Sequence, residues 1–171
     1  MKYILLILAF LVHLPMAAQL VKNTKNFRGS LDVAAGPCLL DGHPCQASVS
    51  ASMTYGYQPN PYLFVGAGLS VNSHLRRYDR PVIYFPFYAD FKVNFTKSRV
   101  SPHLDLRCGY SFLERSSLYL DPSLGISYRL SGNQSLSFAV SCTMQIDTSP
   151  MDGIGYANDC FNLMFRLSYG F

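Results

Sequence analysis

The chain has 171 residues and a formal net charge of +4, and only 14% of its residues are charged. Soluble domains usually carry about 25% charged residues, so this composition argues against an ordinary soluble protein. The small charge excess also gives no reason to expect nucleic-acid binding. Tyr and Phe are abundant, at 12 each, yet no apolar stretch reaches the roughly 20 residues of a membrane-spanning helix. This combination is typical of a chain that crosses a membrane with strands.

The first 18 residues have the pattern of a secretory signal peptide. Lys2 precedes an apolar run over 3–14, and small residues follow at Ala17 and Ala18. We therefore predict a signal peptide over 1–18 and one exported domain over 19–171. Export also argues against a nucleic-acid partner.

Eight segments in which apolar and polar residues alternate follow this leader. Each is close to the roughly 9–11 residues that a tilted strand needs to cross a bilayer. The predicted strands are 27–35, 47–57, 62–72, 82–95, 103–112, 118–130, 136–146 and 161–171. Pro86 and Pro122 fall inside two of them, and proline removes a ladder hydrogen bond. We expect bulges or ladder breaks at both prolines, near the extracellular rim.

The links between these segments suggest an orientation. Short links at 58–61, 96–101 and 131–135 would face the periplasm, and the links at 36–46, 72–81 and 147–159 would face outward. This arrangement places one group of aromatic residues near the periplasmic interface. The group consists of Tyr55, Tyr57, Phe95, Tyr128, Tyr169 and Phe171.

The last segment, 161–171, has an uninterrupted apolar face that ends in an aromatic residue. Phe161, Phe165, Tyr169 and Phe171 all lie on this face. Such a strand resembles the C-terminal insertion signal of bacterial outer-membrane β-barrels.

The chain from Phe27 to Phe171 resembles the OmpA/OmpX-like barrels of Gram-negative bacteria. The resemblance rests on this last strand, on the stretch 85–112 and on the leader. The resemblance implies an all-β fold, an eight-stranded antiparallel up-and-down transmembrane β-barrel with short periplasmic turns. It also implies a location in the cell outer membrane. It implies little about activity, because related folds host different functions.

Charged residues occur on the polar faces of several predicted strands, which would point into the barrel. These residues are Arg28, Asp32, Asp90, Lys92, Asp105, Arg107, Asp121, Arg129 and Arg166. Charges that are desolvated in this way must pair or form hydrogen bonds. They would form either an ion-pair network that closes the barrel or the lining of a gated polar channel. We favour the closed barrel, because eight strands enclose little more than side chains.

Catalytic and metal-binding patterns are weak. His103 and Asp105 share a face, but no serine is distinguished as their partner. Cys38 and Cys45 are a candidate disulfide in the first external loop, since export implies an oxidising setting. His43 lies between them and allows a metal alternative, although structural zinc normally takes four ligands. We expect no enzyme, no metal and no cofactor.

Function is then expected to lie in the loops, which alone meet the exterior. The link 72–81 contains Arg76, Arg77 and Arg80, which would contact an anionic surface partner or simply be solvated. We expect a structural or surface-interaction role, with a narrow pore for small solutes as the alternative and a rim-acting lipid enzyme least favoured. The expected partners are outer-membrane lipid, lipopolysaccharide and, during insertion, the barrel-assembly machinery. We expect a monomer, and the sequence does not identify the surface ligand.

Overall fold

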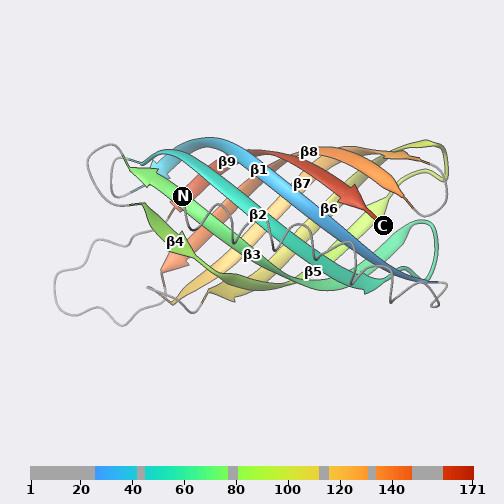
Figure 1. Cartoon of the computed structure of the whole chain (residues 1–171), viewed down its shortest axis with the longest axis horizontal. Coiled ribbons are helices and arrows are strands. Elements are labelled where there is room, and N and C mark those ends of the chain that lie inside the picture. Colours follow the sequence, from blue (N-terminus) through green and yellow to red (C-terminus); the bar gives the residue numbers. More distant parts are fainter. Residues whose placement is uncertain (1–25, 42–44, 77–80, 112–115, 131–133, 148–159) are drawn as a thin grey trace, which may run out of the picture.

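The protein is described here by a computed structural model covering residues 26–41, 45–76, 81–111, 116–130, 134–147 and 160–171. Antiparallel strands form one sheet that closes on itself (Figure 1). The strands are β1 (Phe27–Asp41), β2 (Cys45–Tyr57), β3 (Leu63–Arg76), β4 (Val82–Tyr84), β5 (Pro86–Asn94), β6 (Val100–Ser111), β7 (Ser117–Arg129), β8 (Ser135–Asp147) and β9 (Cys160–Gly170). Within the described ranges, no helix is long and apolar enough to cross a membrane.

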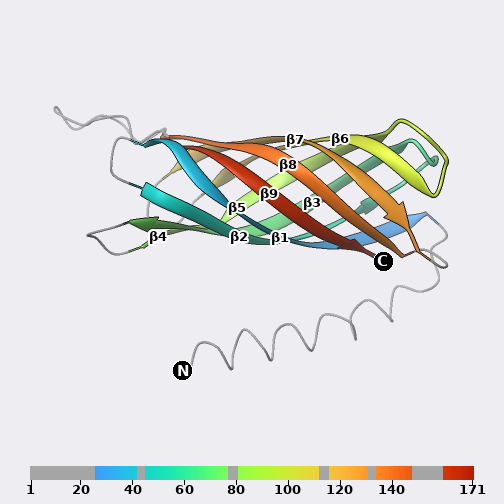
Figure 2. The ribbon, with the colours of Figure 1, turned by 90° about the horizontal axis from the view of Figure 1, so that it is seen from above.

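The strands form a closed ring in which neighbours in sequence are neighbours in space (Figure 2). β1 pairs with both β2 and β9, and β2 pairs onward with β3. β4 and β5 occupy one place in the wall, because both pair with β3. The wall therefore has eight strands, which confirms the predicted up-and-down barrel.

Both prolines interrupt the ladder as expected. β4 and β5 are separated at Phe85, directly before Pro86. The β7–β8 ladder omits Asp121 and Pro122, whereas pairing with β6 is kept at Pro122. The predicted position near the rim is wrong for Pro122, which lies near the middle of β7. The wall tolerates it there because the interruption is confined to one side of the strand.

The strands at the long-loop end are longer than predicted. The link expected over 36–46 is mostly strand, since β1 continues to Asp41 and β2 begins at Cys45. β3 likewise continues to Arg76, within the link predicted over 72–81. The antiparallel ladder continues through these segments, with Pro37 opposite Ala47 and Ser48 opposite His74. Backbone pairing therefore extends beyond the point where the alternation of side chains fades.

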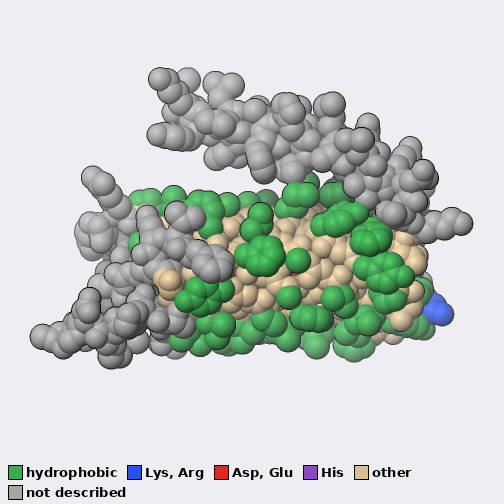
Figure 3. Space-filling model, turned by 90° about the horizontal axis from the view of Figure 1, so that it is seen from below, with side chains coloured by type: hydrophobic (Ala, Val, Ile, Leu, Met, Phe, Trp, Pro, Cys, Tyr) green, Lys and Arg blue, Asp and Glu red, His purple; other side chains and the backbone are tan. Residues whose placement is uncertain are grey.

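The distribution of apolar and polar side chains is the reverse of that in a soluble protein. Large apolar residues cover the outer wall in Figure 3, and Leu124 and Phe138 are 62% and 54% exposed. Most buried side chains are polar or charged. No charged side chain described within a strand is exposed. An outer wall of this kind is stable in contact with lipid tails and unfavourable in water.

Aromatic side chains gather on the outer wall at the end of the barrel with the short turns. The exposed members include Phe27, Tyr55, Tyr57, Phe95, Tyr128 and Tyr169. The rings of Phe27 and Tyr55 stack with centroids 5.8 Å apart, and those of Tyr169 and Phe171 are 6.3 Å apart. Aromatic belts of this kind mark the lipid–water interface of membrane barrels. The predicted aromatic group therefore lies together on one rim.

Candidate functional site

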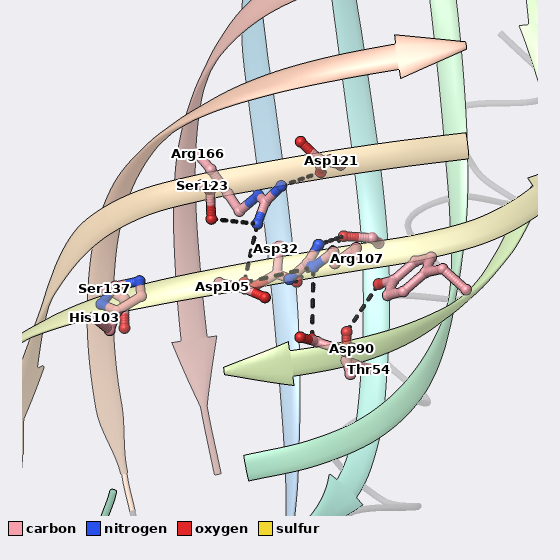
Figure 4. A network of polar contacts seen from close by, with 12 residues as sticks. Asp32, Thr54, Asp90, His103, Asp105, Arg107, Asp121, Ser123, Ser137 and Arg166 are labelled. Atoms are coloured by element: carbon pink, nitrogen blue, oxygen red, sulfur yellow. Dashed lines mark hydrogen bonds and ion pairs between the residues drawn. The ribbon is translucent and has the colours of Figure 1, made fainter. Parts of the chain in front are cut away.

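Arg107 on β6 is the central cation of the barrel interior (Figure 4). Its Nη2 donates to Asp32 Oδ2 on β1 at 2.7 Å, and its Nη1 donates to Ser52 Oγ on β2 at 3.1 Å. Its Nε lies 3.5 Å from Asp90 Oδ2 and 3.6 Å from Asp105 Oδ2. The side chain is only 4% exposed. One guanidinium thus crosses the lumen and joins carboxylates from three strands.

Arg166 on β9 continues this network from the other side of the lumen. Its Nη1 donates to Asp105 Oδ2 and to Ser123 Oγ, each at 3.2 Å. Its Nη2 forms an ion pair with Asp121. Asp105 therefore links the two arginines. Buried ion pairs of this kind need such additional hydrogen bonds to offset the loss of hydration.

The carboxylate of Asp121 is held by two further donors. Tyr119 donates its hydroxyl to Oδ2 at 2.9 Å, and Thr143 donates to Oδ1 at 3.0 Å. Tyr119 belongs to β7 and Thr143 to β8, the two strands whose ladder is interrupted at Pro122. Side chains thus bridge the two strands where the backbone ladder is interrupted.

Tyr88 fills the lumen beside Arg107. It is fully buried, its hydroxyl lies 2.8 Å from Thr54 Oγ1, and the Arg107 guanidinium lies 5.1 Å from its ring centroid. Its two cross-strand neighbours are Gly68 and Gly109. A Cβ at Gly68 would lie 2.6 Å from the Tyr88 ring, and one at Gly109 would lie 2.7 Å from its Cβ. Because glycine has no side chain at these two positions, there is room for the Tyr88 side chain.

A second polar network lies toward the long-loop end. His74 Nδ1 lies 2.7 Å from Ser48 Oγ, and its Nε2 lies 3.0 Å from Gln145 Oε1. Ser48 also donates to Asn162 Oδ1 at 2.9 Å. These side chains come from β2, β3, β8 and β9 and are all buried. Polar side chains thus connect opposite walls in this half of the lumen.

A cavity of about 370 Å³ opens at the short-turn end. Its mouth is formed by the turn at 58–61, Asn26 and Gln134. Three half-buried cations line it, Arg28 from β1, Lys92 from β5 and Arg129 from β7. Its inner end is formed by Asp32, Asp90, Asp105 and Arg107. The cavity is therefore blind, ending at the Arg107 cluster.

The nine charged residues predicted to face inward divide into two groups. Asp32, Asp90, Asp105, Arg107, Asp121 and Arg166 are buried and form the ion-pair network described above. Arg28, Lys92 and Arg129 are half-buried and line the cavity, together with four members of the buried group at its inner end. Arg129 Nη1 donates to the backbone carbonyl of Lys97 at 3.0 Å. Among the described side chains, no carboxylate lies within ion-pair distance of Lys92 or Arg129.

The C-terminal strand closes the ring against β1. Phe161, Phe165 and Tyr169 lie on the outer face of β9, which alternates with buried Asn162, Met164 and Arg166. The backbones of Phe171 and Gly29 exchange two hydrogen bonds of 2.9 Å.

Several sequence predictions fall outside the described residues. These include the signal peptide, His43, residues 77–80 of the link predicted over 72–81 and residues 148–159 of the link predicted over 147–159. The Cys45 side chain is also outside them, so the Cys38–Cys45 pairing stays a prediction. Among the described residues, no group of side chains has the arrangement of a metal site.

The Ser-His-Asp arrangement considered from the sequence does not assemble among the described residues. His103 Nδ1 lies 3.0 Å from Ser127 Oγ, which accepts from Ser137 at 2.8 Å. No hydrogen bond joins His103 to Asp105 in this part of the chain. His103 and Asp105 are both buried in the lumen, away from the lipid-facing wall. The contact therefore ties β6, β7 and β8 together.

Four interior residues were not singled out from the sequence, namely Tyr88, Tyr119, His74 and Gln145. Alternation already places Tyr88 and Tyr119 on the inward faces of their strands. A search restricted to Asp, Glu, Lys and Arg overlooks all four. Large polar residues on the small-residue face of a narrow barrel are the signal that identifies them.

The sequence matches no protein-family model and no curated protein sequence. Solved structures nevertheless share its fold. Neisserial surface protein A is 20% identical, with a TM-score of 0.50 over 84% of this chain and 94% of that one. The outer-membrane protein AlkL is 14% identical, with a TM-score of 0.50 over 87% and 91%. The outer-membrane enzyme PagL is 12% identical, with a TM-score of 0.50 over 82% and 97%.

These similarities show that the chain has the fold of the small eight-stranded outer-membrane β-barrels, as the resemblance predicted. The fold includes a surface protein and an enzyme, so it accommodates more than one kind of activity.

Proposed function

We propose that this chain is an integral protein of the outer membrane whose polar interior is closed and whose external loops act in surface interaction or in envelope structure. The observation that carries the proposal is the inverted distribution of side chains, apolar outside and polar inside. Lipid tails are the solvent in which such an outer wall is favourable. The aromatic belt at the short-turn end supports a membrane interface at that level.

The closed interior is supported by the contents of the lumen. Side-chain clusters fill the lumen along its length. They are the Arg107 and Arg166 clusters, the Tyr88 and Tyr119 rings and the His74 network. A conducting pore needs a continuous water-filled path, and the interior of an eight-stranded barrel has little room beyond its side chains. The proposal therefore favours the closed barrel over the narrow-pore alternative.

The orientation and partners follow from the same proposal. The short turns would face the periplasm and the longer links the exterior, as in outer-membrane barrels. The leader over 1–18 would direct export, and the barrel-assembly machinery would recognise the last strand. Outer-membrane lipid and lipopolysaccharide would surround a monomeric barrel. No catalytic role is proposed, since His103 lies inside the closed lumen.

Planar-bilayer recording tests whether the interior is closed. The refolded protein is expected to give no discrete conductance steps. The double variant Asp90→Asn/Arg107→Gln removes two charges from the lumen and should create leakage if side-chain packing is what closes it. Discrete steps from the unmodified protein that change size in this variant would overturn the closed barrel and support the pore.

A further inference from the structure

The cavity at the short-turn end is a candidate binding site. Its volume of about 370 Å³ lies within the roughly 300–1,000 Å³ range of small-molecule pockets. It is open at the turns and closed at the Arg107 cluster, so a solute could enter and leave only at one end. Such a shape suits binding and does not suit conduction.

Acidic and basic side chains both line this cavity. The carboxylates of Asp32, Asp90 and Asp105 lie at the inner end, and each is within 3.6 Å of Arg107. Arg28, Lys92 and Arg129 line the same cavity, and Lys92 lies opposite Asp105 in the β5–β6 ladder. The carboxylates are thus already engaged with Arg107, whereas among the described side chains none lies within ion-pair distance of Lys92 or Arg129.

Arg28 from β1 and Arg129 from β7 line the same cavity. Two half-buried cations held in this way are stabilised by an anion placed between them. Hydroxyl groups also line the cavity, including Ser30, Ser101 and Ser135. Cations surrounded by neutral donors are the groups that hold carboxylate and phosphate oxygens in proteins.

We infer that this cavity binds a small solute carrying a carboxylate or phosphate group, with its acidic group held between Arg28, Lys92 and Arg129. The solute enters at the short-turn end. That this end faces the periplasm rests on the proposed function, whereas binding itself requires only the folded barrel.

Isothermal titration of the refolded mature chain in detergent micelles tests the inference. Inorganic phosphate and succinate are titrated separately at constant ionic strength set with sodium chloride. Saturable binding of either anion is expected, and the tighter one identifies which acidic group the cavity prefers. The double variant Arg28→Gln/Arg129→Gln should bind at least about tenfold more weakly, because it removes the charge-assisted hydrogen bonds of two of the three cations.

A matched control removes the same charge from the same end of the barrel. Lys97→Gln/Arg99→Gln lowers the net charge by two on an exposed turn that does not line the cavity. This control should keep the affinity of the unmodified protein. The single variant Lys92→Gln provides a second test inside the cavity, and the gel shift on heating shows that each variant is folded.

Two results would overturn the inference, and neither depends on which way the barrel faces. One is the absence of saturable binding of both anions by the folded, unmodified protein. The other is an equal loss of affinity in the cavity variant and in the turn control. That result would mean that anion affinity depends on the net charge of the protein and not on the cavity. Conductance steps in the bilayer experiment would contradict the closed interior and leave this titration unaffected.

Discussion

Replacing Arg107 by Met is expected to destabilise the folded barrel by about 3–5 kcal/mol, the usual cost of removing one partner from a buried ion pair. Arg107 is within ion-pair distance of Asp32, Asp90 and Asp105. Of the ion pairs that the described residues form with these carboxylates, only the one between Arg166 and Asp105 would remain. It would also remove the cation that lies over the Tyr88 ring.

Urea unfolding of the refolded protein in detergent, followed by the gel shift on heating, measures this effect. Arg99→Met is the control, because Arg99 is exposed on a short turn and its loss should change the unfolding free energy by less than about 0.5 kcal/mol. Combining Arg107→Met with Asp32→Asn, Asp90→Asn and Asp105→Asn should recover much of the stability, since it removes the unpaired charges. Equal stability of Arg107→Met and Arg99→Met would contradict the ion-pair network.

The second large effect is expected on the outer wall, at Leu124. This residue is 62% exposed near the middle of β7 and lies opposite Leu104 and Val140, which are also exposed. In a bilayer, Leu124→Arg should cost about 2–4 kcal/mol of folding free energy, the known cost of a cation on the lipid face near the midplane. On the surface of a soluble protein, the same change would cost no more than about 0.5 kcal/mol.

The comparison requires folding into phospholipid vesicles, with urea titrations of the unmodified protein and the variant. Ser98→Arg adds the same cation at an exposed turn and should leave stability nearly unchanged. If Leu124→Arg and Ser98→Arg behave alike in vesicles, Leu124 does not face lipid.

The fold could be predicted because its main determinant is local. The period of two puts residues such as Phe165 and Arg166 on opposite faces of a strand, and a tightly closed barrel turns that alternation into an inside and an outside. The break at Pro86 was also predictable, since the missing N–H is a property of the residue itself. Strand ends were less predictable, because pairing with a neighbouring strand extends β1 past Gly36 and Pro37.

The organisation of the interior could be predicted only in part. Alternation assigns Lys92 and Arg107 alike to the lumen, but it gives no position along the barrel axis. That position depends on the stagger between strands, which sets Arg107 beside Asp32, a residue 75 positions away in the chain. The division into a buried network and a cation-lined cavity, and the pairing of Tyr88 with Gly68 and Gly109, follow from this stagger.

The most direct test of the lipid-facing wall uses the fact that the chain has no Trp. The single substitutions Phe138→Trp, on the outer wall, and Tyr119→Trp, in the lumen, each provide one fluorophore. In vesicles of phosphatidylcholine brominated on its acyl chains, the fluorescence of the Phe138→Trp variant should be strongly quenched and that of the Tyr119→Trp variant nearly unaffected. Equal quenching in both variants, or stronger quenching in the lumen variant, would contradict a barrel that places its apolar wall in the membrane.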